Sequence, residues 1–133
     1  MLAGVDCHTM SDVGPPIGPD PGAGRPTVCI GHVGGSSCPA DWARALQDAF
    51  AARFDGAVTI DDPFAGGYVT RRHAAEMPWV QVELARTTQE TFAAQRAGVL
   101  AALKDWCSWL IGPLAAHRLP RAITPTSKED KPR

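Results

Sequence analysis

The chain has 133 residues, a formal net charge of −1 and 44% hydrophobic residues, values typical of one globular domain. Such a balanced charge gives no reason to expect a nucleic-acid or acidic-membrane partner. The sequence contains no run of about 18 apolar residues and no basic signal-peptide start, so we expect a cytoplasmic protein without a membrane span.

The first half of the chain predicts two strands, a loop and a helix. Residues 2–8 are short and apolar and predict a strand. Residues 11–26 contain four glycines and five prolines and therefore predict a loop. Residues 27–32 predict a second buried strand. Residues 39–54 predict an amphipathic helix, because apolar side chains recur there at three- and four-residue steps.

The second half of the chain continues the alternation of strands and helices. Residues 57–61 predict a third strand, and residues 79–85 predict a fourth in which apolar and polar side chains alternate. Residues 88–111 predict a long helix that ends before a Gly-Pro pair. Its expected apolar stripe comprises Phe92, Val99, Leu103, Trp106 and Leu110.

This order of elements predicts a single α/β domain over residues 1–117, with a mostly parallel or mixed sheet. Residues 118–133 are polar and contain proline, so we expect a disordered tail. Ligands of open α/β sheets bind outside the carboxyl ends of the strands, and we expect the polar residues at the strand ends to gather there. They are Asp6, His8, Gly31, His32, Asp61, Asp62 and the stretch from Glu83 to Arg86.

Two common kinds of site are not indicated by the sequence. The cysteines Cys7, Cys29, Cys38 and Cys107 match no C-x-x-C zinc pattern and no disulfide framework. We expect reduced thiols, mostly buried as small apolar side chains. His32 precedes a pair of serines, but no Gly-x-Ser-x-Gly elbow is present, which argues against a Ser-His nucleophile.

Three stretches resemble, in order, the C-terminal part of the N-formylglutamate amidohydrolase (N-formylglutamate deformylase) family. They are "DCHTM" at residues 6–10, "TVCIGHVGGSSC" at residues 27–38, and "DPFAGGYVTRRH" at residues 62–73 with "VQVELAR" at residues 80–86. The third stretch is the most specific, and the resemblance extends to about residue 90. It implies a three-layer, zinc-peptidase-like α/β fold. It also implies a metal-dependent hydrolysis that releases formate from an N-formylated acidic amino acid.

The resemblance implies a zinc ligand and a general base. His8 matches a zinc-ligand histidine, which Asp6 could orient unless Asp6 simply ends the strand. The alternative for a lone histidine is a partly buried side chain bonded to a loop carbonyl. Glu83 matches a base that takes a proton from zinc-bound water and passes it to the leaving amine. Its alternative is an ordinary solvent-facing position on a half-exposed strand.

The resemblance also implies a substrate-binding turn. Arg71 matches an arginine that could grip a substrate carboxylate in a bidentate fork, with a surface arginine as the alternative. Arg86 is a weaker candidate for the same carboxylate, or for an ion pair with Glu83. Gly66 and Gly67 allow close backbone approach to a ligand or form a plain tight turn. Tyr68 could bond to substrate or lie with its hydroxyl at the surface.

The family's other metal ligands precede the segment that matches here, so the resemblance predicts one of three zinc ligands in this chain. We therefore expect a truncated or split form with impaired catalysis and an exposed sheet edge that favours self-association. Arg72 and His73 stand where the family more often has His and Tyr. Two alternatives are a non-catalytic remnant that binds an acidic small molecule or a partner, and a half-protein that pairs with a separate N-terminal chain. In the enzyme hypothesis the partner is a small N-acyl amino acid substrate.

Overall fold

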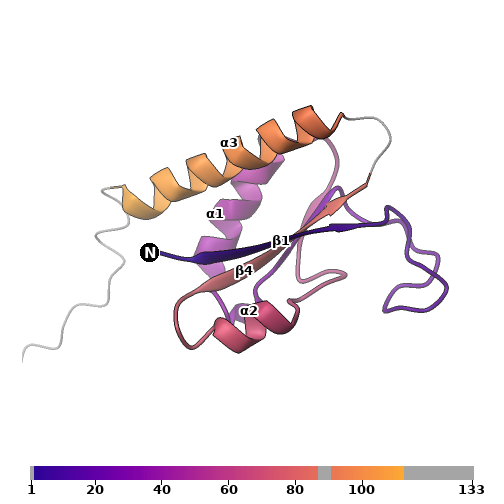
Figure 1. The fold of residues 1–133 in the computed structure, drawn as a ribbon, viewed down its shortest axis with the longest axis horizontal. Coiled ribbons are helices and arrows are strands. Elements are labelled where there is room, and N and C mark those ends of the chain that lie inside the picture. The colour runs from indigo at the N-terminus through magenta and orange to yellow at the C-terminus, as the bar shows by residue number, and fades with distance from the viewer. Residues whose placement is uncertain (1, 87–90, 113–133) are drawn as a thin grey trace, which may run out of the picture.

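A computed structural model describes residues 2–86 and 91–112, which form a mixed four-stranded sheet with helices on both faces (Figure 1). In sheet order the strands are β1 (Gly4–Met10), β4 (Trp79–Ala85), β2 (Val28–Gly31) and β3 (Val58–Ile60). β1 runs parallel to β4, and β3 runs parallel to β2, whereas β2 and β4 are antiparallel. The predicted α/β class with a mixed sheet is confirmed.

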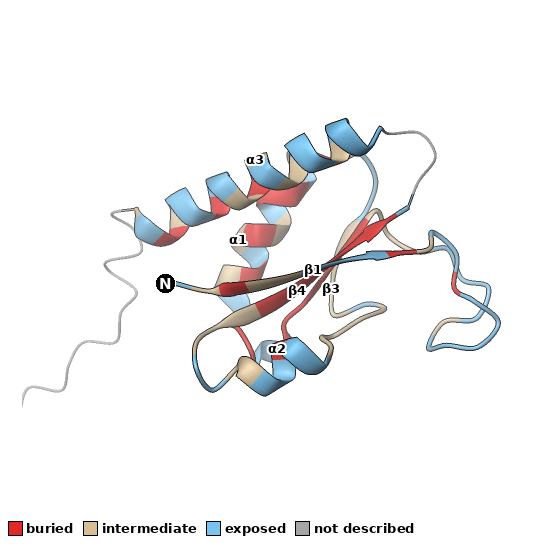
Figure 2. Cartoon of the chain, viewed as in Figure 1, coloured by how far each residue is buried: buried red, intermediate tan, exposed pale blue. Residues whose placement is uncertain are grey.

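One face of the sheet is apolar and carries the two long helices, α1 (Ala40–Ala51) and α3 (Phe92–Ile111) (Figures 1 and 2). β4 contributes Val80, Val82 and Leu84 to this face because alternate side chains of a strand point to the same side. The helices are also joined to each other, since Trp106 Nε1–H donates to the Trp42 carbonyl at 2.9 Å. The main hydrophobic core therefore lies between the sheet and these helices.

The boundaries of the helices differ in part from the predicted ones. α1 ends at Ala51, although Phe54 beyond it is still buried and packs on α3 at Gly98. Thr91 caps α3, and its hydroxyl accepts the Ala94 N–H at 3.2 Å. Phe92 is 82% exposed and does not belong to the apolar stripe, because the first turn of α3 extends beyond the contact with Phe54.

Two predictions fall wholly or partly on residues that the structure does not describe. The disordered tail predicted at residues 118–133 lies outside the described residues, and so do residues 88–90 at the predicted start of the last helix. Among the helices of the described residues, none combines the length and apolar character that crossing a membrane requires.

The opposite face of the sheet, called the polar face below, carries α2 (Tyr68–His73) and the segment of residues 61–67 (Figure 1). The strand residues on this face are Gly4, Asp6, His8, Met10, Cys29, Gly31, Thr59, Trp79, Gln81, Glu83 and Ala85. The sequence did not predict α2, because six residues are too few to display a helical period. The 3₁₀ turn Val33–Gly35 follows β2.

The expectation that all strand ends gather at one edge of the sheet is wrong. β2 is antiparallel to β4, so the carboxyl ends of β2 and β3 lie opposite to those of β1 and β4. His32 and Asp61 are therefore separated from the end of the sheet where Arg86 follows β4. The pairing instead sets Gly31 beside Gln81 and Cys29 beside Glu83.

The cysteines are all free thiols, as predicted, but only half of them are buried. Burial raises the pKa of Cys29 and raises that of Cys38 to about 12, with the nearby Asp41 carboxylate adding to the effect at Cys38. Cys7 and Cys107 are exposed, so the expectation of mostly buried thiols is only partly correct.

Candidate active site

Glu83 is a buried carboxylate in the middle of β4, with only 8% of the residue exposed. A carboxylate with so little solvent contact requires hydrogen bonds to offset the loss of hydration. Gln81, two positions earlier on the same face, donates Nε2–H to Glu83 Oε1 at 2.6 Å. The alternative of a solvent-facing glutamate on a half-exposed strand is therefore wrong.

A turn formed by Gly66 and Gly67, called the glycine turn below, lies directly over Gln81. The Gly67 N–H donates to Gln81 Oε1, so the amide nitrogen of Gln81 is the group that faces Glu83. A Cβ on Gly67 would lie 3.0 Å from the same Gln81 oxygen. A side chain at Gly67 would therefore require the Gln81 amide to shift.

The other contacts of the glycine turn are equally close. Gly66 has φ of 138°, a value that L-residues with side chains rarely adopt. A Cβ on Gly31 of β2 would lie 2.7 Å from the carbonyl carbon of Ala65. The turn therefore packs closely against both β2 and β4, an arrangement that suits a plain tight turn as well as a ligand-binding one.

Asp61 and His32 hold the start of this segment against the end of β2. The Asp61 carboxylate accepts the backbone N–H of His32 and that of Gly34, each at 2.7 Å. The Val33 N–H donates to the Ala65 carbonyl at 2.7 Å. His32 Nδ1 lies 3.2 Å from the Cys38 carbonyl and Nε2 lies 3.5 Å from Asp61 Oδ2. His32 and Asp61 thus act as structural residues of the turn region.

His8 lies beside Glu83 in the pairing of β1 with β4, and Asp6 lies beside Gln81. His8 Nε2 is 2.8 Å from Asp6 Oδ1, and the His8 side chain is 49% exposed. The partner of this imidazole is therefore a carboxylate on the same strand and not a loop carbonyl. A carboxylate in this position can fix the orientation of a metal-binding histidine.

The residues that could bind a metal ion form an incomplete set. Within residues 2–86 and 91–112, no three His, Cys, Asp or Glu side chains come together in an arrangement that could hold one. The polar face offers the imidazole of His8, with Asp6 behind it, next to the Glu83 position. A catalytic zinc ion typically takes three protein ligands.

Arg71 and Tyr68 both lie on α2, directly after the glycine turn. Arg71 is exposed, and its Nε–H donates to the Gly66 carbonyl at 3.0 Å. This bond uses Nε, so both Nη groups retain donors for a further partner. Tyr68 is 79% exposed, which places it at the rim of the turn.

Arg86 does not lie with the other predicted site residues. Arg86 is exposed just after β4, and the ion pair with Glu83 that was considered for it is not formed between these two described residues. Arg72 is exposed, and His73 Nδ1 lies 2.9 Å from Glu76 Oε1. The structure brings His8 and Glu83 together and places Arg71 on the glycine turn, but leaves Arg86 outside this group.

Sequence reasoning did not assign a role to Gln81 or to Arg25. Gln81 could have been found, because Gln81 and Glu83 alternate with apolar residues and must share one face of the strand. Arg25 and Asp20 lie in a stretch rich in glycine and proline that predicted only a connection. Their pairing depends on how that loop folds, which no local pattern in the sequence reveals.

The fold and the site define a mixed α/β domain with a buried carboxylate beneath a glycine turn on one face of its sheet. A family model described as N-formylglutamate amidohydrolase matches residues 2–89, and the chain belongs to this family. The predicted resemblance is thereby confirmed.

A solved structure of similar fold is the crystal structure of N-formylglutamate amidohydrolase from Ralstonia eutropha JMP134, with a TM-score of 0.56 and 16% sequence identity. The match covers 77% of this chain and 41% of that chain, so this chain spans less than half of its length. At this identity the similarity concerns the fold alone. No curated protein matches the chain at a significant level.

Proposed function

We propose that the polar face takes part in the hydrolysis of N-formyl-L-glutamate, or a related N-acyl amino acid, to formate (or the corresponding acid) and the free amino acid. Membership of the N-formylglutamate amidohydrolase family supports this proposal. The structural observation that carries it is the buried Glu83 carboxylate, hydrogen-bonded by Gln81 beneath the glycine turn.

Glu83 acts as the general base in this proposal. Its Oε1 accepts the Gln81 N–H, so Oε2 can accept a proton from the attacking water. The water oxygen forms a bond to the formyl carbon, and Glu83 then passes the proton to the amine nitrogen as the C–N bond breaks. Formate and the free amino acid are the products.

Arg71 supplies recognition of the substrate carboxylate. Its Nε is held by the Gly66 carbonyl, which fixes the guanidinium beside the turn, and its Nη groups can donate to an acidic group. Gly66 and Gly67 allow the substrate to approach the backbone, and Tyr68 contributes a hydroxyl at the rim. Arg86 lies apart from these residues and is the weaker candidate.

Zinc is the metal that we propose for this site, with His8 as a ligand and Asp6 as the carboxylate that orients it. A bound zinc ion lowers the pKa of a coordinated water and so makes it a better nucleophile. The described residues bring no three possible ligands together, so we propose that the remaining ligands come from elsewhere, for example from a partner chain. We therefore expect the chain by itself to release formate slowly.

Formate release from N-formyl-L-glutamate, measured with and without added zinc, tests the proposal. Glu83→Gln keeps the size of the side chain and removes the base. It should lower the rate by on the order of a hundredfold or more. Arg71→Ala should mainly raise KM. Equal rates for the unchanged chain and the Glu83→Gln variant would contradict the role of Glu83.

A second candidate function is the binding of an acidic small molecule without catalysis. The incomplete metal set, beside a glycine turn and an arginine that are fully assembled, favours this candidate. Calorimetry with N-formyl-L-glutamate separates the two functions in a chain that releases no formate. Binding that survives Glu83→Gln and is lost in Arg71→Ala supports the binder, and binding unaffected by Arg71→Ala contradicts it.

A further inference from the structure

The loop between β1 and β2 is folded upon itself. Its two arms are joined by hydrogen bonds from Gly14 N–H to the Ala23 carbonyl and from Arg25 N–H to the Asp12 carbonyl, each 2.8 Å long. The loop therefore has a defined structure that can present a side chain in a fixed position.

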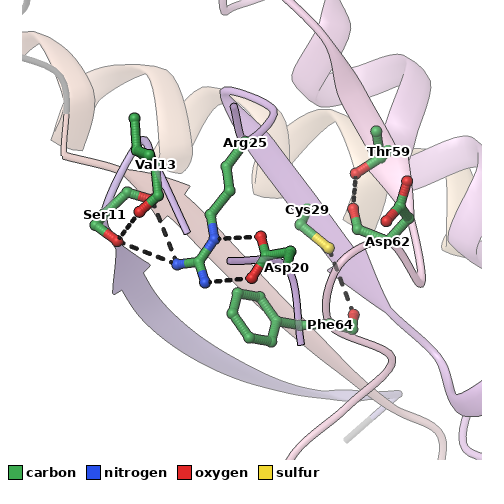
Figure 3. A network of polar contacts seen from close by, with 8 residues as sticks. All are labelled: Ser11, Val13, Asp20, Arg25, Cys29, Thr59, Asp62 and Phe64. Carbon is green, nitrogen blue, oxygen red and sulfur yellow. Dashed lines mark hydrogen bonds and ion pairs between the residues drawn. The ribbon is translucent and has the colours of Figure 1, made fainter. Parts of the chain in front are cut away.

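Arg25 is the side chain that this loop buries, and only 5% of it is exposed. Its Nε and Nη2 donate to the two carboxylate oxygens of Asp20 at 2.7 and 2.8 Å, and Nη1 donates to Ser11 Oγ at 3.2 Å (Figure 3). A bidentate pair of this kind fixes the plane of the guanidinium. The hydrogen bond to Asp20 raises the pKa of Arg25, and the nearby charge of Glu83 acts in the same direction.

Arg25 also lies over the ring of Phe64, with Cζ 4.9 Å from the ring centroid (Figure 3). This distance is within the range of a cation–π contact. The ring packs against a small cluster on the polar face, formed by Met10, Cys29 and Ala85. The Phe64 carbonyl accepts the Cys29 thiol at 3.4 Å. Phe64 is thus held between the sheet and the Arg25 guanidinium.

Phe64 stands two residues before Gly66, so whatever fixes Phe64 also fixes the start of the glycine turn. The glycine turn orients Gln81 through the Gly67 N–H, and Gln81 donates to Glu83. Contacts thus connect Arg25 with Glu83 through Phe64, the glycine turn and Gln81. Asp20 and Ser11 engage all three nitrogens of the guanidinium, so Arg25 is not free to bind a substrate carboxylate as Arg71 is.

We propose that Arg25 is a positioning residue for Glu83. Arg25 holds Phe64 in place, and Phe64 thereby keeps the glycine turn and the Gln81 amide in the position from which Gln81 donates to Glu83. The proposal rests on the role of Glu83 given above. Arg25 does not touch the reacting atoms and acts through the turn.

Amide hydrogen exchange at Gly67, followed by NMR, tests this proposal without requiring catalysis. Arg25→Gln removes the charge and the fork, and should speed exchange at Gly67 by about tenfold. Phe64→Leu keeps an apolar side chain but removes the ring face, and should act in the same direction. Arg53→Gln is the matched control: it breaks a 2.6 Å ion pair with Asp105 and should leave Gly67 unchanged.

Arg25→Lys provides a milder variant should Arg25→Gln fail to fold, since lysine keeps the charge and loses the planar fork. Thermal unfolding of each variant shows that the fold is retained. Unchanged exchange at Gly67 in folded Arg25→Lys and Phe64→Leu variants would overturn the proposal.

Formate release gives the second readout, which depends on the proposed function. The positioning role predicts that Arg25→Lys lowers kcat, and that KM rises as well because the glycine turn also holds Arg71, whereas a change in KM alone would overturn it. If the unchanged chain forms no formate, the catalytic proposal fails, and exchange at Gly67 still decides whether Arg25 positions the turn.

Discussion

Gln81 is the residue that connects the backbone of the glycine turn with the proposed base. Its amide accepts from Gly67 and donates to Glu83, so both of its polar atoms are used. A buried amide with both functions satisfied orders its neighbours, and its removal leaves their polar groups unpaired. The alternation in β4 indicates that Gln81 shares a face with Glu83, but nothing in the sequence indicates the turn that reaches Gln81.

Gln81→Met should destabilise the protein, because methionine fills a similar volume and cannot pair with Gly67 or Glu83. We expect a loss of about 1–3 kcal/mol in the free energy of unfolding, measured by urea denaturation. Gln47→Met is the matched control, since Gln47 makes a single 2.7 Å bond to the Val58 carbonyl beside α1. The prediction fails if the two variants lose equal stability.

Asp20 provides a prediction about pH at the same scale. The hydrogen bond from Arg25 holds the pKa of Asp20 below its usual value. The pair therefore stabilises the fold above the unfolded pKa of about 3.9, and this contribution disappears as the pH falls through the lower folded pKa. Asp20→Asn should be less stable than the unchanged chain near neutral pH. The difference should vanish in acid, and a difference independent of pH would contradict this.

At the scale of secondary structure, what could be predicted depended on the length of each element. β4 was predicted with its observed bounds, because its seven residues alternate clearly between apolar and polar side chains. α2 was missed because it is a single short stretch fixed by contacts of the glycine turn. The direction of β2 relative to β4 was also missed, because strand pairing is set by distant parts of the chain.

Gly31 tests how closely the segment before the glycine turn must approach β2. Gly31→Ala would bring a Cβ within 2.7–2.8 Å of backbone atoms of Ala65 and Gly66, which forces the segment to move. We expect a loss of about 1–3 kcal/mol in urea denaturation, together with faster amide exchange at Gly67. Gly24→Ala is the control, because a Cβ there meets nothing within 4 Å. Equal stability of both variants would contradict the close approach.

At the scale of the whole molecule, one face of the sheet forms the main core and the other carries the proposed site. The apolar face carries α1 and α3 and the main core, whereas the polar face carries α2, the glycine turn and the proposed site (Figure 2). This division could be predicted in part from the alternation in β4. The mixed order of strands prevented a correct prediction of which polar residues meet.

The reactivity of the cysteine thiols tests this packing. Cys29 and Cys38 are buried, and burial raises the pKa of each, so alkylation by iodoacetamide near pH 8 should spare them in the folded protein. Cys7 and Cys107 are exposed, and Cys107 should react first because partial burial and the Asp6 carboxylate raise the pKa of Cys7. Mass spectrometry of digested protein measures the order. Early modification of Cys38 under native conditions would contradict the packing described here.

The central claim is that the polar face beneath the glycine turn is the functional site. Mapping of NMR chemical shifts during titration with N-formyl-L-glutamate tests it most directly, because it requires binding and not turnover. We predict that the largest changes occur at Gly66, Gly67, Arg71 and the side-chain amide of Gln81. Changes confined to α1 and α3, or none at saturating ligand, would contradict the claim.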